Sequence, residues 1–258
     1  MRVSVVTINY NTGGGFKRTC DSVLSQDYPH LEWVVVDGLS GDQSALDIET
    51  NSPAIHRLIR EKDDGIADAF NKGIAAASGE AMIFINAGDS FESHDSLSTL
   101  VRLWNRDRHG WFAGSARFMT EAGQEMYVRD VGGLSPLRLV DRGCRVVHSS
   151  VLIDSALIRS FGGYDVSYRS AMDFDLWVRL ISRGFLPQQS SLIASRFYLG
   201  GTSSSYSGFE EELRSLRENG LLGARARLWM TARKRAVSRL GKIKRYRLAY
   251  EIKERFIK

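Results

Sequence analysis

The stretch Ala81–Phe91, AMIFINAGDSF, decides the fold. Five of its first six residues are apolar, a pattern typical of a short buried strand. The run then ends in the turn-forming sequence NAGD, whose last residue is Asp89. Open α/β sheets bind their ligands at the carboxyl ends of the strands. The stretch therefore predicts a buried strand that carries Asp89 to a binding site, although an ordinary turn carboxylate would have the same pattern.

The composition is that of a globular protein, with 258 residues, 43% hydrophobic and 25% charged. No apolar run approaches the roughly 18 residues needed to cross a bilayer. Met1 and Arg2 lead directly into a strand-like run, so no signal peptide is predicted. The two cysteines, Cys20 and Cys144, form neither a disulfide framework nor a metal-ligand spacing. These features predict a protein of the reducing cytoplasm.

The first hundred residues alternate between strand and helix patterns. We expect strands at VSVVTIN (3–9), LEWVVVD (31–37), AIHRLIRE (54–61) and AMIFIN (81–86). Helical spacing occurs between them, at residues 16–26, 44–49 and 65–79. Strands separated by helices predict an α/β fold with a parallel, right-handed βαβ sheet.

The second half has a looser pattern. We expect strands at 111–119, 125–131, 148–154 and 191–199, and helices at 95–106, 155–163 and 172–185. In the last of these helices Phe174, Trp177, Leu180 and Ile181 share one face, and Gly184 ends the helix. The sequence predicts one α/β domain over residues 1–208 and a helical extension over residues 209–258.

Three acids follow predicted strands, namely Asp37, Asp63 and Asp89. In a parallel sheet all three lie at the edge where a nucleotide would bind. Each of them alone could equally be a helix cap or a turn residue. The Gly-rich segment 13–15 has neither the GK[ST] ending of a P-loop nor a G-x-G-x-x-G pattern, which argues against an ATPase or a dinucleotide enzyme.

These segments together resemble a known family. VSVVTINYN, LEWVVVDGLSGD, EKDDGIADAFNKGIAAASGE and IFINAGD, followed by HSSVLI, GGYDVSYRSAMDFDLWVRL and FYLGGTSS, are similar to the successive motifs of family-two inverting glycosyltransferases. The resemblance covers roughly residues 3 to 205 and is closest to bacterial enzymes of exopolysaccharide and colanic-acid synthesis. It implies the GT-A fold, a single Rossmann-like, mostly parallel sheet flanked by helices. It also implies a nucleotide-sugar donor, a UDP-sugar by preference.

The resemblance assigns donor-binding roles to five residues. Tyr10 would lie against the nucleobase, Asp37 would accept a hydrogen bond from it, and Asp63 would line the nucleotide pocket. Asn71 and Lys72 follow in the next helix and are placed near the diphosphate in sequence terms.

The resemblance also assigns the reaction centre. Asp89 would hold Mg²⁺ or Mn²⁺, which neutralises the departing diphosphate. Asp173 would be the general base that deprotonates the acceptor hydroxyl, while Asp175, two residues further along the helix, should face elsewhere. His148 would border the acceptor site, although a core histidine is an equal alternative. Where many relatives have a paired acid, this chain has Gly88.

The last segment, residues 224–258, contains thirteen Lys or Arg residues and two Glu. A basic amphipathic helix is typical of an element that binds an anionic membrane surface. Membrane attachment at the inner face of the plasma membrane would suit a polyprenyl-linked or growing glycan acceptor, but the apolar side of the tail could also pack on the domain. Two other functions remain open, a sugar-nucleotide pyrophosphorylase and a non-catalytic membrane- or nucleic-acid-binding module. Strand-end acids repel phosphate, so we expect no nucleic acid partner.

Overall fold

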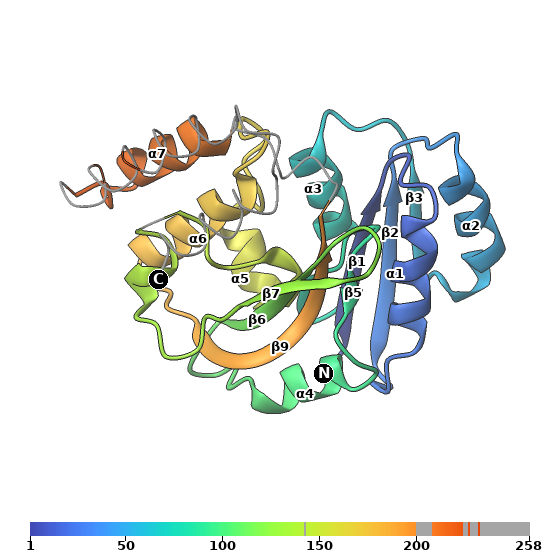
Figure 1. The fold of residues 1–258 in the computed structure, drawn as a ribbon, viewed down its shortest axis with the longest axis horizontal. Coiled ribbons are helices and arrows are strands. Elements are labelled where there is room, and N and C mark those ends of the chain that lie inside the picture. Colours follow the sequence, from blue (N-terminus) through green and yellow to red (C-terminus); the bar gives the residue numbers. More distant parts are fainter. Residues whose placement is uncertain (142, 200–207, 224–226, 228–231, 233–258) are drawn as a thin grey trace.

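The computed structural model describes residues 1–141, 143–199, 208–223, 227 and 232. Within them a nine-stranded sheet has the order β3-β2-β1-β4-β8-β6-β9-β5, and β7 pairs with β6 outside this path (Figure 1). The predicted α/β fold is confirmed.

The first part of the chain is a parallel βαβ unit. Its strands are β1 (Val3–Asn9), β2 (Leu31–Asp37), β3 (Arg57–Arg60) and β4 (Ala81–Phe84), and its helices are α1 (Gly15–Leu24), α2 (Gln43–Asn51) and α3 (Ile66–Ala76). Successive side chains of β1, β2 and β4 are buried on both faces of the sheet. Burial on both faces explains why these strands are continuous apolar runs.

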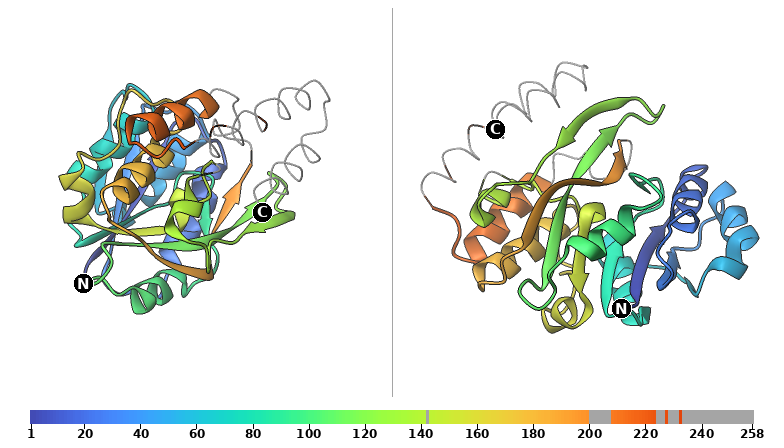
Figure 2. Two further views of the ribbon diagram at one scale, coloured as in Figure 1. Left: turned by 90° about the vertical axis from the view of Figure 1, so that its left-hand side faces the viewer. Right: turned by 90° about the horizontal axis from the view of Figure 1, so that it is seen from below.

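The rest of the sheet is mixed in direction. Its strands are β5 (Ser90–Phe91), β6 (Trp111–Met119), β7 (Glu125–Arg129), β8 (Val151–Asp154) and β9 (Gln188–Tyr198). Among the described strands β5, β7 and β8 run opposite to the others. Strand β9 curls strongly around this half of the molecule (Figure 1), and the β6–β7 hairpin projects beyond the body (Figure 2).

Helices cover both faces of the sheet. One apolar cluster joins α1 and α4 (Ser96–Leu103) to side chains such as Trp33. The opposite cluster joins α3, α5 (Ser155–Ser160), α6 (Met172–Ser182) and α7 (Gly208–Glu218). The predicted apolar face of α6 is buried, since Phe174, Trp177 and Leu180 are each 0% exposed. Gly184 follows α6 at φ +83°, which fits its predicted role at the end of the helix.

The expected strand at residues 148–154 is only partly correct. Its first three residues form a short 3₁₀ turn, η3 (His148–Ser150), and β8 begins at Val151. The hydroxyl of Ser150 donates to the carbonyls of Val147 and Gly114, and the Ser150 N–H donates to Val147 as well. Serine hydroxyls that bond to nearby backbone compete with strand pairing. Two further 3₁₀ turns are η1 (Ser52–Ala54) and η2 (Pro136–Leu139).

Helix α7 packs against α6 and the preceding loop. Glu211 accepts hydrogen bonds from the backbone N–H groups of Arg169, Ser170 and Ala171, and Leu216 is fully buried in the core. The boundary at residue 208 stays a prediction. The predicted basic tail lies almost entirely outside the described residues. No helix in the described part of the chain has the length and apolar character to span a bilayer.

Candidate active site

The loop after β4 presents Asp89 through a tight turn. The Asp89 N–H donates to the Asn86 carbonyl at 2.9 Å, and Gly88 has a φ of +106°. Thr19 on α1 holds this turn, because its hydroxyl accepts from the Gly88 N–H at 2.9 Å and donates to the Asp89 carbonyl at 2.6 Å. A backbone conformation at this φ favours glycine. The backbone conformation at position 88 therefore explains why this chain has a glycine there and no paired acid.

The Asp89 carboxylate is only partly satisfied by the protein. It is 5% exposed, and its Oδ1 accepts a hydrogen bond from the Tyr198 N–H at 3.0 Å. Its Oδ2 lies 3.8 Å from His148 Nε2, beyond hydrogen-bonding distance. Burial raises the pKa of Asp89 to about 7, although the Tyr198 N–H and the charge of Arg18 oppose this rise.

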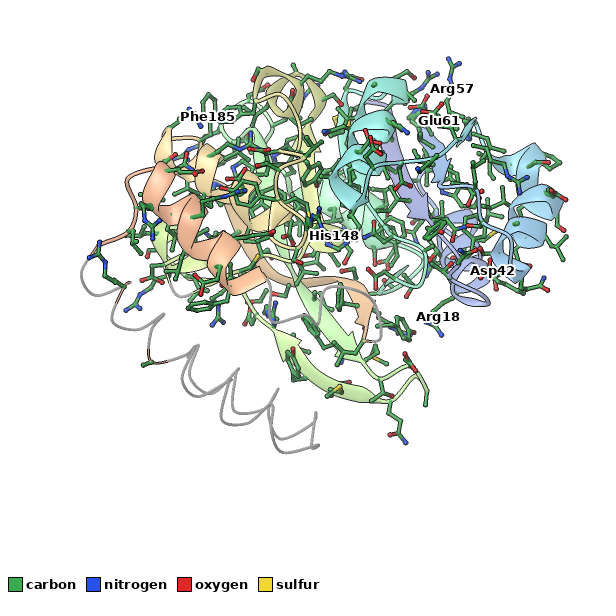
Figure 3. All side chains as sticks on the ribbon, turned by 90° about the horizontal axis from the view of Figure 1, so that it is seen from above. Arg18, Asp42, Arg57, Glu61, His148 and Phe185 are labelled. Atoms are coloured by element: carbon green, nitrogen blue, oxygen red, sulfur yellow. The ribbon has the colours of Figure 1, made fainter. Side chains whose placement is uncertain are left out.

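His148 lies between two carboxylates. Its Nδ1 is 4.0 Å from Asp173 Oδ2, and its buried Nε2 has no hydrogen-bond partner among the residues that the structure describes. Phe70 and Phe197 pack against the ring, with centroids at 5.9 and 6.1 Å. Burial lowers the pKa of His148 to about 4, so the imidazole is neutral near pH 7. Figure 3 shows His148 in the interior, between the two halves of the domain.

Asp173 is the second residue of α6. Its Oδ1 accepts a hydrogen bond from the N–H of the next residue, Phe174, at 2.7 Å. Burial, helped by the nearby Glu212, raises the pKa of Asp173 to about 6, while the Phe174 N–H and Arg129 oppose the rise. A carboxyl group with a pKa in this range is suited to accept a proton near neutral pH.

We call Asp89, His148 and Asp173 the acidic cluster. The chain brings them together from the end of β4, from η3 and from the start of α6. Asp89 and His148 are buried and Asp173 is half-buried, the described residues give each of them few hydrogen bonds, and all three have a shifted pKa. Such groups are typical of functional sites, where polar contacts are left for a ligand. Asp89 Oδ2 and His148 Nε2 lie 3.8 Å apart, and neither atom has a hydrogen bond from the described residues.

The residues therefore fit a divalent cation, with Asp89 as its carboxylate ligand. Carboxylate oxygen is a preferred ligand of Mg²⁺ and Mn²⁺, and these ions keep several waters or phosphate oxygens in their shells. Within the described residues no group of three or more His, Cys, Asp or Glu side chains is placed to hold a metal ion.

A second group of predicted residues meets at the ends of β1 and β2. Tyr10 is 64% exposed, and its ring borders Gly38. A Cβ at position 38 would collide with Asp63 Oδ2 and come within 3.1 Å of the Tyr10 ring. The carboxylate of Asp63 also accepts the Gly65 N–H at 3.0 Å. The structure thus brings Tyr10 and Asp63 together across a glycine, with an aromatic face open to solvent.

Asp37 is placed differently from the other predicted donor residues. It is 0% exposed, and its carboxylate contacts Arg60 Nε at 3.2 Å, the Asn9 amide at 2.9 Å and the Ser40 N–H at 3.2 Å. These contacts join β1, β2 and β3 beneath the loop that carries Gly38. A hydrogen bond from a nucleobase would require this carboxylate to become accessible, so that role stays a prediction.

The structure does not bring Asn71 and Lys72 to the acidic cluster. The Asn71 amide accepts the Tyr164 N–H at 2.9 Å and donates to the Tyr164 carbonyl at 2.8 Å, which ties α3 to the loop before α6. Lys72 binds Glu61 at 3.0 Å and Asp68 at 3.2 Å. These contacts give Asn71 and Lys72 a structural role. They do not support the predicted position of the two residues near a diphosphate.

Sequence reasoning missed Arg18, Thr19 and Tyr198, which surround Asp89. Arg18 donates to the Gly88 carbonyl at 3.0 Å, and its guanidinium carbon lies 3.8 Å from the centroid of the Tyr198 ring. No local motif marks these residues, because α1 and the end of β9 meet the β4 loop only in the folded chain. Asp175 faces away from the cluster as predicted, towards Arg179 and Ser215.

Comparison with solved structures shows which class of fold this is. Residues 1–349 of TarS from S. aureus, in complex with UDP-GlcNAc, match 95% of this chain and 74% of that chain, with a TM-score of 0.70 and 17% sequence identity. The mannosyltransferase PcManGT from Pyrobaculum calidifontis, solved with GDP-Man and Mn²⁺, matches 97% of this chain and 78% of that chain, with a TM-score of 0.67 and 18% identity. The fold is the GT-A fold of glycosyltransferases, as the sequence predicted.

Sequence comparison identifies the family. An uncharacterised glycosyltransferase of Mycobacterium tuberculosis strain H37Rv is 32% identical over 184 residues, 69% of this chain and 68% of the relative. A PGL/p-HBAD biosynthesis glycosyltransferase of Mycobacterium tuberculosis strain H37Ra is 25% identical over 211 residues, 78% of this chain and 79% of the relative. The model of the family described as glycosyl transferase family 2 matches residues 4–138. The chain belongs to glycosyl transferase family 2 and is a glycosyltransferase.

Proposed function

We propose that the protein transfers a sugar, with inversion at the anomeric carbon, from a nucleotide-sugar donor to a glycan or polyprenyl-linked acceptor. The acidic cluster is the observation that carries this proposal. It places a candidate metal ligand, Asp89, and a candidate base, Asp173, on either side of one neutral imidazole. Inverting transfer needs stabilisation of the leaving diphosphate and removal of a proton from the acceptor hydroxyl.

The donor binds along the carboxyl ends of β1, β2 and β4. The exposed Tyr10 ring offers a stacking surface for the base beside Asp63. A UDP-sugar is the preferred donor. The fold neighbours were solved with UDP-GlcNAc and with GDP-Man, so both bases belong in the test.

Asp89 would hold Mg²⁺ or Mn²⁺, which would supply charge neutralisation for the departing diphosphate. The protein's own part is to hold the Asp89 carboxylate in place through the Tyr198 N–H and the turn fixed by Thr19. Burial of Asp89 and His148 lowers the local dielectric, which strengthens the electrostatic contacts that these two groups make.

Asp173 accepts the proton of the acceptor hydroxyl. One of its oxygens is already held by the Phe174 N–H, and Oδ2 faces His148 at 4.0 Å without a hydrogen bond. His148 separates the two carboxylates and borders the space in which the acceptor hydroxyl would lie.

The acceptor belongs to bacterial glycolipid or surface polysaccharide synthesis in this proposal. Two observations support it, the resemblance to a glycosyltransferase of PGL/p-HBAD biosynthesis and the basic sequence of residues 224–258. The enzyme would act in the cytoplasm, attached peripherally to the anionic inner face of the plasma membrane. Membership of glycosyl transferase family 2 gives no support to a pyrophosphorylase or to a non-catalytic module.

Calorimetric titration with UDP and GDP, with Mn²⁺ and with EDTA, tests the proposal. We expect the wild-type protein to bind one of these nucleotides and Mn²⁺ to strengthen binding at least tenfold. Asp89→Asn should abolish the effect of Mn²⁺. The matched control Asp107→Asn removes an exposed acid on another part of the surface and should leave binding unchanged. Failure of the wild-type protein to bind either nucleotide would refute the proposal.

A further inference from the structure

Arg18 is a cation placed beside the loop that presents Asp89. It lies in the second turn of α1, is partly buried, and donates from Nη1 to the Gly88 carbonyl at 3.0 Å. The face of its guanidinium covers the ring of Tyr198, with 3.8 Å between its carbon and the ring centroid. These two contacts fix the position of a long side chain, as cation–π and hydrogen-bond contacts do elsewhere. Figure 3 shows Arg18 at the rim of the domain.

Both contacts of Arg18 lead to Asp89. Gly88 precedes Asp89 in the turn, and the Tyr198 N–H donates to Asp89 Oδ1 at 3.0 Å. The guanidinium therefore lies next to the two backbone segments that hold the candidate metal ligand. A positive charge at this place favours the ionised carboxylate and any anion that binds beside it.

Arg18 has no carboxylate partner among the residues that the structure describes. This distinguishes it from its neighbour Lys17, which forms an ion pair with Asp21 at 3.0 Å. It also differs from Arg117 and Arg196, which both bind Glu92. A guanidinium has five N–H donors in a planar fork that matches phosphate oxygens. In the described contacts Arg18 uses only Nη1 for a hydrogen bond, so several donors stay open to a ligand.

One divalent cation at Asp89 would not balance the full charge of a bound diphosphate. A departing nucleoside diphosphate carries two or three negative charges, and a divalent cation held by one carboxylate neutralises only part of them. Gly88, at a φ of +106°, contributes a carbonyl that Arg18 binds and no second acid. Arg18 thus places a further positive charge beside the candidate metal ligand Asp89.

We propose that Arg18 binds the diphosphate of the nucleotide-sugar donor and so shares its neutralisation with the metal ion. This inference rests on the proposed function. Arg18 is a binding residue in it, whereas Thr19 holds the backbone of the Asp89 loop and the Tyr198 N–H holds the Asp89 carboxylate. The chemistry recognised is a diphosphate, whichever base the donor carries.

The test compares nucleoside diphosphates with monophosphates by calorimetry, using UDP and UMP, with GDP and GMP in parallel. Arg18→Gln should weaken diphosphate binding about 10- to 100-fold, the range for loss of a charge-assisted hydrogen bond. Monophosphate binding should change less than twofold. Diphosphate binding should weaken both with Mn²⁺ and with EDTA, since Arg18 contributes its own charge. Arg18→Lys should recover part of the loss because it keeps the charge.

The matched control is Lys17→Gln, which removes the adjacent exposed cation and should leave both affinities unchanged. If Arg18→Gln weakened mono- and diphosphate binding equally, Arg18 would only stabilise the Asp89 loop, and the inference would be overturned. Unchanged diphosphate binding would overturn it as well. Either result leaves the proposed function intact as long as the wild-type protein binds a diphosphate, whereas a wild-type protein that binds none refutes both.

Discussion

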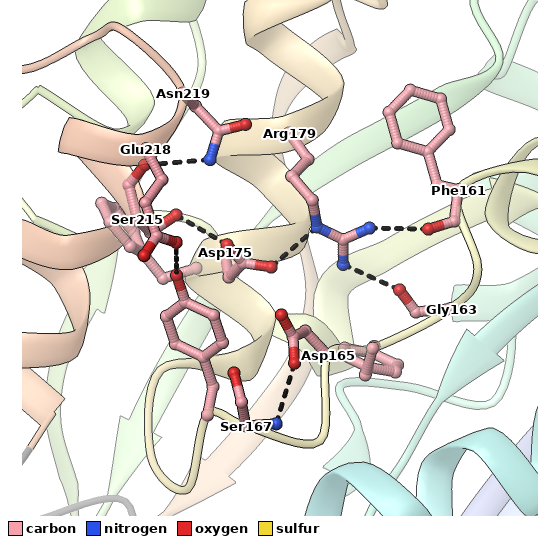
Figure 4. Close-up of polar contacts among 12 residues, drawn as sticks. Phe161, Gly163, Asp165, Ser167, Asp175, Arg179, Ser215, Glu218 and Asn219 are labelled. Atoms are coloured by element: carbon pink, nitrogen blue, oxygen red, sulfur yellow. Dashed lines mark hydrogen bonds and ion pairs between the residues drawn. The ribbon is translucent and has the colours of Figure 1, made fainter.

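Two carboxylates on the same helix have opposite surroundings. Asp173 has one hydrogen bond from its neighbouring backbone N–H, and burial raises its pKa to about 6. Asp175, two residues later, is paired with Arg179 at 2.7 Å and accepts the Ser215 hydroxyl at 2.8 Å (Figure 4). Arg179 in turn donates to the carbonyls of Phe161 and Gly163, so this network is closed.

The comparison teaches how structural and functional acids differ in this protein. At the α6–α7 contact Asp175 is paired with Arg179 and accepts from Ser215, and this network holds two helices and a loop together. In the acidic cluster, Asp89, His148 and Asp173 lie close together without completing one another's hydrogen bonds. A buried group without partners costs stability, so its retention indicates a ligand that completes it.

The largest structural effect should come from Asp175→Asn. This change leaves Arg179 without its ion-pair partner in a buried site, which costs about 3–5 kcal/mol in the free energy of unfolding. Asp173→Asn should change that free energy by less than about 1 kcal/mol, because the Asp173 carboxylate accepts only one hydrogen bond from the described residues, the one from the Phe174 N–H. Urea unfolding of both variants measures the difference. A larger loss of stability in Asp173→Asn than in Asp175→Asn would break the comparison.

Glu32 extends the comparison to the other end of the sheet. Burial alone would raise the pKa of Glu32, but hydrogen bonds from Ser4, Ser78 and the backbone outweigh it and hold the pKa below its usual value. A depressed folded-state pKa contributes stability that is present above the unfolded-state pKa and is lost as pH falls through the folded-state value.

Glu32→Gln should therefore lower the free energy of unfolding by about 1–3 kcal/mol at pH 7. As the pH falls, the free energy of unfolding of the variant should decrease less steeply than that of the wild-type protein. Acid titration followed by circular dichroism measures this, with the exposed Glu121→Gln as the control. Identical acid transitions in Glu32→Gln and the wild-type protein would show that this carboxylate is not a structural acid.

Gly88→Ala tests the turn that carries Asp89. A residue with a Cβ at a φ of +106° is strained, which costs about 1–2 kcal/mol. The strain should displace the Asp89 loop and weaken the effect of Mn²⁺ on nucleotide binding. Gly41→Ala is the matched control, because a Cβ there meets nothing within 4 Å and Gly41 has no positive φ. Equal behaviour of the two variants in thermal unfolding and in calorimetry would contradict this role.

The sequence was sufficient for the elements whose patterns are local. The apolar runs of β1, β2 and β4 and the apolar face of α6 predict their burial directly, because periodicity depends only on neighbouring residues. The η3 turn escaped prediction because, besides its bonds to Val147, the Ser150 hydroxyl donates to the Gly114 carbonyl, far along the chain. Alternation of side chains gives no sign of such a contact.

The sequence pointed to the candidate acids but not to the residues that contact them. Asp89 and Asp173 stand in motifs that the family resemblance identifies. The burial of Asp37 depends on Arg60 from the neighbouring strand, and the position of Arg18 depends on how α1 meets the end of β9. Pairings between distant elements follow from the sheet order, which no single motif contains.

The central claim is that Asp173 is the base of a glycosyl transfer. The most direct measurement is the rate of transfer by Asp173→Asn, together with calorimetric binding of the donor nucleotide in the presence of Mn²⁺. The account predicts a rate lower by about 10²- to 10⁴-fold, the usual contribution of a general base, with nucleotide affinity within twofold of the wild-type value. Transfer at the wild-type rate by a variant that binds the nucleotide normally would contradict it.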